Sequence, residues 1–137
     1  MAQVYITKRA HFSAAHRLHS EQLDEKQNKK IYGLCNNPYG HGHNYELEIT
    51  IKGEPDPVTG MIMDLKELKD IINKEIVDKM DHKHLNYDVD FMKGIVPTAE
   101  NIAIVIWNRL KAKIKTGELY EVKVYETPRN IAVYRGE

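Results

Sequence analysis

The sequence has a single cysteine, Cys35, and a single tryptophan among its 137 residues. One cysteine excludes an intramolecular disulfide and is typical of a reducing compartment. Acidic and basic side chains cancel to a formal net charge of zero, so the positive charge typical of nucleic-acid-binding domains is missing. The N-terminus lacks the apolar stretch of a signal peptide, and the longest apolar run, residues 102–107, is too short to span a bilayer. We therefore expect a cytoplasmic protein with neither nucleic-acid nor membrane partners.

The sequence also lacks repeats, low-complexity tracts and any proline- or glycine-rich linker that would mark a domain boundary. What it does contain is typical of a soluble globular protein, with 42% hydrophobic and 29% charged residues. This length suffices for one hydrophobic core. We expect residues 1–137 to form a single domain.

Alternating apolar and polar residues predict two strands in the first half of the chain, over residues 4–15 and 43–52. The apolar faces of these strands consist of Val4, Ile6, Ala10, Phe12 and Ala14, and of Tyr45, Leu47, Ile49 and Ile51. Between them, residues 17–34 are polar and irregular, with room for one short helix. Two prolines and two glycines predict a loop over residues 53–60.

Helical spacing of apolar residues predicts one helix that starts after Asp64 and extends to Met80, and another that starts near Thr98. Strands over 119–126 and 131–135 close the chain. The order β-β-α-α-β-β predicts an α+β fold with a four-stranded antiparallel sheet and both helices on one face. No further segment covers the other face of the sheet, so we expect the subunits to associate.

Three histidines are candidates for one metal centre. His41 and His43 have the same strand parity, so on an extended chain their side chains point to the same side. His16 continues the parity of Phe12 at the end of the first strand, whereas His11 has the opposite parity. Three neutral imidazoles with a free fourth position are typical of a catalytic zinc site.

Cys35 has two possible roles in "CNNPYGHGHNY", residues 35–45. It could complete a closed structural zinc site as a fourth ligand. Alternatively, the turn-forming "NNPYG" directs the thiol elsewhere, where an imidazole held by a carboxylate could take its proton. Asp81 and His82 could form such a pair, but His84 lies in the same long connection, and chemistry alone leaves the choice between the two histidines open.

Taken together, "FSAAHRL", "CNNPYGHGHNY", "DHKHLN", "PTAEN" and "VYETPRNIAVYRGE" closely resemble the 6-pyruvoyl-tetrahydropterin synthase family, in order and over almost the whole chain. The resemblance implies a tunnelling fold, or T-fold. In that fold three subunits join their sheets into a twelve-stranded barrel, and two trimers stack into a homohexamer with active sites between subunits. Closing a barrel would remove the open sheet edges.

The resemblance also implies a role for each candidate site residue. One Zn²⁺ per subunit would be bound by His16, His41 and His43, and Cys35 would be the catalytic base. Asp81 and His82 would assist it, typically from a neighbouring subunit. Substrate-binding roles are implied for Glu126, which would anchor the pterin edge, and for two residues that would border the same pocket, Thr98 and Glu100.

The implied activity is that of a carbon–oxygen lyase of tetrahydrobiopterin biosynthesis. Such an enzyme converts 7,8-dihydroneopterin triphosphate to 6-pyruvoyl-tetrahydropterin and expels triphosphate. One alternative is a 6-carboxytetrahydropterin synthase of queuosine biosynthesis, in which the cysteine usually stands closer to the HGH motif. The other, from a different class, is a non-catalytic zinc-stabilised module with Cys35 on the metal.

Overall fold

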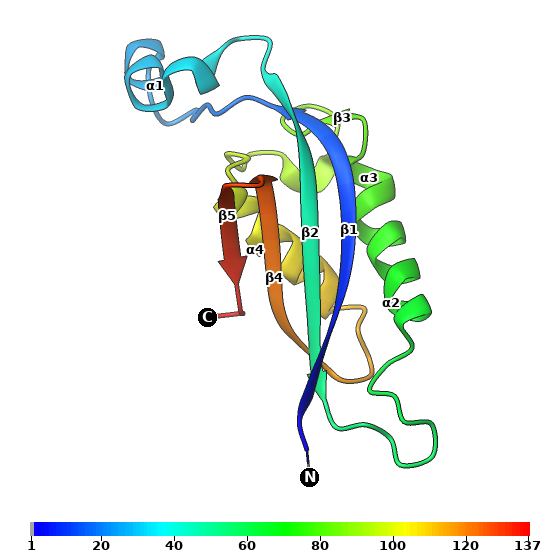
Figure 1. The fold of residues 1–137 in the computed structure, drawn as a ribbon. Coiled ribbons are helices and arrows are strands. Elements are labelled where there is room, and N and C mark those ends of the chain that lie inside the picture. The colour runs from blue at the N-terminus through cyan, green and yellow to red at the C-terminus, as the bar shows by residue number, and fades with distance from the viewer. Residues whose placement is uncertain (1) are drawn as a thin grey trace.

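Five strands form one sheet in the order β3-β1-β2-β4-β5 (Figure 1). The computed structural model describes residues 2–137. Its two long central strands, β1 and β2, pair in antiparallel fashion along their whole length, from Val4 opposite Gly53 to His16 opposite His41. The strands are β1 (Val4–His16), β2 (His41–Gly53), β3 (Lys83–His84), β4 (Glu118–Thr127) and β5 (Asn130–Tyr134).

The prediction of a four-stranded antiparallel sheet is therefore wrong in one respect. A fifth strand of two residues, β3, pairs in parallel with the end of β1. Ala14 lies opposite Lys83, and the N–H groups of His82 and Leu85 donate to the carbonyl oxygens of Ser13 and Ala15. Leu85 is fully buried directly after β3. A two-residue strand is too short for an alternation pattern, so this pairing is fixed by tertiary contacts rather than by local sequence.

The two expected helices pack on one face of the sheet, as Figure 1 shows. The first is continuous but has a π-helical middle: α2 (Leu65–Ile72), η2 (Asn73–Val77) and α3 (Asp78–Met80). The second is α4 (Ala99–Lys111), capped by the side chain of Thr98, which accepts from the backbone N–H of Asn101. None of the helices in residues 2–137 is long and apolar enough to cross a membrane.

A short helix lies within residues 17–34, where the sequence left room for one, and extends the element order beyond β-β-α-α-β-β. The chain between β1 and β2 leaves the end of the sheet, forms α1 (Glu25–Tyr32) and the 3₁₀ turn η1 (Gly33–Asn36), and returns (Figure 1). A capping box between Asp24 and Gln27 starts α1. A further 3₁₀ turn, η3 (Asp90–Met92), lies in the connection after β3. The histidines at the end of β1 and the start of β2 therefore lie at the base of this excursion.

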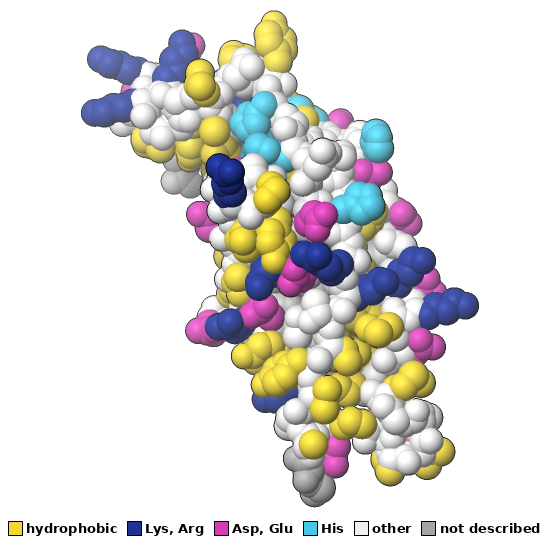
Figure 2. All heavy atoms as spheres, in the orientation of Figure 1, with side chains coloured by type: hydrophobic (Ala, Val, Ile, Leu, Met, Phe, Trp, Pro, Cys, Tyr) yellow, Lys and Arg dark blue, Asp and Glu magenta, His cyan; other side chains and the backbone are white. Residues whose placement is uncertain are grey.

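The hydrophobic core fills the space between the sheet and its helices. Phe12, Tyr45 and Leu47 are fully buried there, as the strand parity predicts. The opposite sheet face is open, and Figure 2 shows charged side chains across it with hydrophobic ones among them. Arg9 donates to Glu48 at 2.9 Å on this face, and the hydroxyls of Thr7 and Thr50 lie 2.8 Å apart.

Candidate active site and metal centre

The register between β1 and β2 brings three histidines together on the core-facing side of the sheet. His16 pairs directly with His41, and His43 pairs with the next inward-facing residue of β1, Ala14. One ligand atom from each of the three imidazoles lies within 4.8 Å of the others. The parity argument for this trio is confirmed. His11 is exposed on the other face, as expected.

Each imidazole presents a nitrogen to a common point. The Nε2 atoms of His16 and His41 lie 3.1 Å apart, and Nε2 of His43 is buried without a hydrogen-bond partner among the described residues. Nδ1 of His16 lies 2.7 Å from the carbonyl oxygen of Pro97. Because a carbonyl oxygen can only accept, the proton of His16 is on Nδ1, and Nε2 is free to bind a metal.

The electrostatic environment favours the neutral forms of His16 and His43. Burial lowers the pKa of His16 to about 4, opposed by its bond to the Pro97 carbonyl and assisted by the neighbouring His41 and His43. Burial also lowers the pKa of His43, although the Glu126 carboxylate opposes the effect. Neutral imidazole is the form that binds divalent metals. The donor set, its orientation and its unpartnered nitrogen all fit a metal ion.

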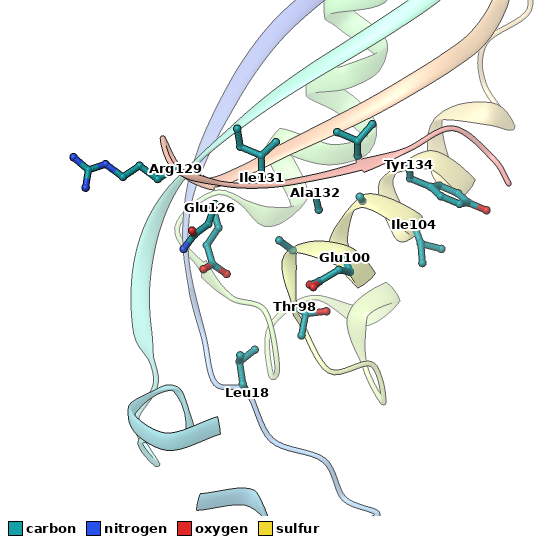
Figure 3. Close-up of a pocket in the computed structure, with 13 residues that line it drawn as sticks. Leu18, Thr98, Glu100, Ile104, Glu126, Arg129, Ile131, Ala132 and Tyr134 are labelled. Carbon is teal, nitrogen blue, oxygen red and sulfur yellow. The ribbon is translucent and has the colours of Figure 1, made fainter. Parts of the chain in front are cut away.

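Glu126, at the end of β4, connects the histidines with a pocket. Its two carboxylate oxygens lie 3.9 Å from Nε2 of His16 and 3.9 Å from Nε2 of His43. The pocket has a volume of about 670 Å³, which is the size of small-molecule sites. Figure 3 shows the carboxylate pointing into it, while the side chain of Arg129 on the following turn points away.

Thr98 and Glu100 lie across this pocket from Glu126, as expected for residues that border it (Figure 3). Thr98 also has a structural role as the cap of α4. Glu100 is exposed in the first turn of α4, where a carboxylate interacts favourably with the helix dipole. The structure therefore brings together all three residues to which the resemblance gives a substrate-binding role.

Cys35 is not part of the three-histidine group. The group of side chains that could bind a metal within residues 2–137 contains the three histidines alone. Cys35 lies in η1, is half-buried, and its carbonyl oxygen accepts from the N–H of Leu18. The geometry opposes the closed four-ligand site and leaves the thiol available for chemistry.

Asp81 and His82 form the expected pair. Nδ1 of His82 lies 2.8 Å from Oδ2 of Asp81, and Oδ1 of Asp81 accepts from the N–H of Ser13 at 2.8 Å. The Ser13 N–H and His82 lower the pKa of the Asp81 carboxyl. The His82 side chain is 84% exposed, and no hydrogen bond between the described residues joins the pair with Cys35. Within one chain, the pair and the thiol are separate.

Two features of this region are not evident from the sequence pattern. His84, the rival of His82, lies in β3 with a buried Nε2 atom that has no partner among the described residues. A Cβ added to Gly40 would lie 2.8 Å from that nitrogen, so the chain directly before His41 packs closely on the ring of His84. The Pro97 carbonyl that orients His16 is a backbone atom, which no side-chain motif reveals.

The fold and the site together define a class: an α+β protein with a three-histidine centre, able to hold a metal ion, beside a pocket of small-molecule size. Residues 5–137 match the family model described as 6-pyruvoyl tetrahydropterin synthase. The chain belongs to the 6-pyruvoyl tetrahydropterin synthase family.

Two similar proteins and one solved structure match over nearly their full length. The chain is 51% identical over 134 residues to a 6-pyruvoyl tetrahydrobiopterin synthase of Dictyostelium discoideum, covering 98% of this chain and 97% of that protein. It is 48% identical over 135 residues to the Homo sapiens protein of that name, covering 98% and 93%. The structure of Caenorhabditis elegans 6-pyruvoyl tetrahydropterin synthase superposes with a TM-score of 0.95 at 44% identity, covering 100% of this chain and 98% of that one.

Proposed function

We propose that the chain converts 7,8-dihydroneopterin triphosphate to 6-pyruvoyl-tetrahydropterin with release of triphosphate, in tetrahydrobiopterin biosynthesis. Its family and its full-length similarity to proteins of that name support this activity. The observation that carries the proposal is the position of Glu126, which lines the pocket with its carboxylate 3.9 Å from two of the three histidines. A pterin anchored there would present its side chain to the metal centre.

Zn²⁺ is the metal that we assign to His16, His41 and His43, one per subunit. Three imidazoles with a free fourth position are typical of catalytic zinc, and the lowered pKa of His16 favours the neutral ligand. When bound, Zn²⁺ would supply Lewis-acid chemistry that makes C–H bonds beside the substrate's side-chain oxygens more acidic. The bond from Nδ1 of His16 to the Pro97 carbonyl orients that ligand.

Glu126 binds the substrate in this proposal. The guanidine-like N2/N3 edge of a pterin offers two parallel N–H groups, and one carboxylate can accept both. Thr98 and Glu100 border the pocket from the α4 side. The dihydropterin ring and its side chain would thus be held in one orientation, with the side-chain carbons toward Cys35.

Cys35 acts as the base. As thiolate it removes a proton from a side-chain carbon and returns one to the ring at C6, while triphosphate leaves from the terminal carbon. The two hydroxyl-bearing carbons become carbonyls and so release two electron pairs. One pair reduces the C6=N5 double bond, and the other converts the terminal carbon from CH2–O to CH3 as triphosphate leaves, so no external reductant is needed. Such a thiol must stay reduced, which favours the cytoplasm.

Asp81 and His82 assist Cys35 from a neighbouring subunit. Support comes from the exposure of His82 and from the lack of a hydrogen bond between the pair and Cys35 within the described residues. Exposed Ile131 and Val133 on the edge strand β5 also favour pairing with another subunit. We assign the assembly as a homohexamer of two trimers, each with a twelve-stranded barrel.

The experiment is turnover of 7,8-dihydroneopterin triphosphate by the zinc-loaded protein under reducing, anaerobic conditions, with mass spectrometry of all products. The proposal predicts a three-carbon pyruvoyl group at C6 and one triphosphate per pterin. A carboxylate at C6 with release of acetaldehyde would instead identify a 6-carboxytetrahydropterin synthase. No turnover by a folded, metal-loaded protein would contradict both activities.

A further inference from the structure

The segment that carries Cys35 is held in place by polar side chains. Between residues 17 and 44, all within the described part of the chain, the only buried residues are two asparagines, Asn28 and Asn36. Leu34, next to the cysteine, is 94% exposed. Apolar packing therefore does not fix the position of the thiol, and hydrogen bonds must do so.

Asn36 makes the bonds that tie η1 to the chain leaving β1. Its Nδ2 atom donates to the carbonyl oxygen of Leu18 at 2.7 Å and lies 3.1 Å from Nδ1 of His19. Its backbone oxygen accepts from Nε of Arg17 at 3.0 Å. The N–H of Leu18 donates to the carbonyl oxygen of Cys35 at 2.9 Å. Both backbone groups of Leu18 are therefore bonded to the thiol-bearing turn.

Leu18 connects this turn with the active site. It is two residues from His16, and its side chain lines the pocket that contains Glu126 (Figure 3). The backbone of Arg17, between His16 and Leu18, is fixed as well. The side chain of Asn86 accepts from its N–H at 2.9 Å and donates to its carbonyl oxygen at 2.8 Å. A movement of Asn36 would therefore displace the thiol of Cys35 relative to the metal ligand His16.

We infer that Asn36 is a positioning residue for Cys35, whose buried amide sets the place of the thiol relative to the metal centre and the pocket. The effect on turnover rests on the proposed function, because it requires Cys35 to be the base. Only an amide of this shape both donates to the Leu18 carbonyl and lies beside the Arg17 guanidinium, whose Nη2 is 3.5 Å from Oδ1. An aspartate there would set a carboxylate oxygen against the Leu18 carbonyl oxygen.

The test is Asn36→Asp, compared with the same change at two other asparagines. Asn28→Asp disturbs a different part of the connection between β1 and β2, because Asn28 bonds the N–H and C=O of Ser20. Asn37→Asp adds the same charge one residue further along, at an exposed position. We expect Asn36→Asp to lower kcat by about 100-fold with a small change in KM and unchanged zinc content. Both controls should stay within about threefold of the parent.

A second readout does not depend on turnover. Because Cys35 is the only cysteine, the pH dependence of alkylation by iodoacetamide reports on that thiol alone. We expect this profile to change in Asn36→Asp and to be retained in both controls. A parent-like profile and kcat in Asn36→Asp, or equal losses in Asn28→Asp, would overturn the inference. If the unchanged protein shows no turnover but Asn36→Asp still alters the alkylation profile, the proposed function fails and the positioning role stands.

Should Asn36→Asp fail to fold, the unchanged protein still gives a decisive measurement. By NMR, the side-chain amide protons of Asn36 should exchange with solvent at least about tenfold more slowly than those of exposed Asn37. Equal exchange at the two asparagines would show that the buried bonds of Asn36 do not persist in solution, and it would overturn the inference.

Discussion

The carbonyl oxygen of Pro97 lies 2.7 Å from Nδ1 of His16, although 81 positions separate the two residues in the chain. The bond joins the end of β1 to the residue directly before the cap of α4. It fixes the ring of His16 and leaves Nε2 unprotonated for a metal. The three-histidine group and the α4 wall of the pocket are therefore parts of one connected structure.

Removal of one imidazole should abolish tight metal binding. We expect His41→Ala to weaken zinc binding by at least about 100-fold, because the change leaves only two of the three protein ligands to hold the metal. Zinc content after dialysis against a weak chelator, measured by elemental mass spectrometry, tests this. His11→Ala makes the same chemical change on the exposed sheet face and should keep its zinc. Equal zinc in both variants would exclude the three-histidine centre.

Loss of the Tyr45 hydroxyl should have a smaller effect. This hydroxyl lies 3.1 Å from Nδ1 of His16 and is buried, which raises the pKa of Tyr45. Because the Pro97 carbonyl still holds the ring, we expect Tyr45→Phe to cost about 1 kcal/mol of unfolding free energy and less than about tenfold in zinc affinity. Urea unfolding and a competitive zinc titration measure the two. A loss of zinc as large as that of His41→Ala would mean that the hydroxyl, not the carbonyl, orients His16.

Glu126→Gln tests the pterin anchor. The change keeps the shape but removes the charge and one acceptor, so the bidentate contact is lost. We expect KM to rise by about 10- to 100-fold, equivalent to the loss of a charged hydrogen bond, with zinc content unchanged. Steady-state kinetics test this, with Glu118→Gln at the exposed start of β4 as the matched control. An unchanged KM would remove Glu126 from the substrate-binding role.

The ionisation of Asp81 predicts a pH-dependent stability difference. The Ser13 N–H and His82 lower the pKa of folded Asp81 below its ordinary value. Ionised Asp81 therefore stabilises the fold above the pKa of an unfolded aspartate, about 3.9, and this contribution disappears as the pH falls through the lower pKa of the folded protein. The difference in unfolding free energy between the parent and Asp81→Asn should be constant above about pH 5 and shrink below it. A difference that grows toward acid would contradict these contacts.

Strand parity was enough to predict the group of three histidines. Because side chains alternate strictly along a strand, His41 and His43 had to share a face, and only His16 among the nearby histidines matched the inward parity of β1. The register that sets His16 opposite His41 then follows from two long strands with matching apolar faces. The helix over residues 65–80 was likewise predictable from a periodic pattern, here the helical spacing of Leu68, Ile72 and Ile76.

Other features depend on contacts that leave no periodic signal. β3 is two residues long and pairs only with Ala14 and Ala15 at the edge of β1. The side chains of Asn28 and Asn36 are buried in a segment that is polar throughout, so composition predicts exposure for both. The tie between Asn36 and Leu18 joins a side chain to a backbone atom, which no pattern of residue types reveals.

The measurement that tests the account most directly is zinc content and turnover of Cys35→Ala, determined on the same preparation. If three histidines bind the metal and the thiol is the base, the variant remains folded with one zinc per chain and loses turnover by at least about 1,000-fold. Retention of zinc with loss of catalysis is the predicted result. Loss of zinc together with the thiol would return Cys35 to the metal, and full turnover without the thiol would remove it from the chemistry.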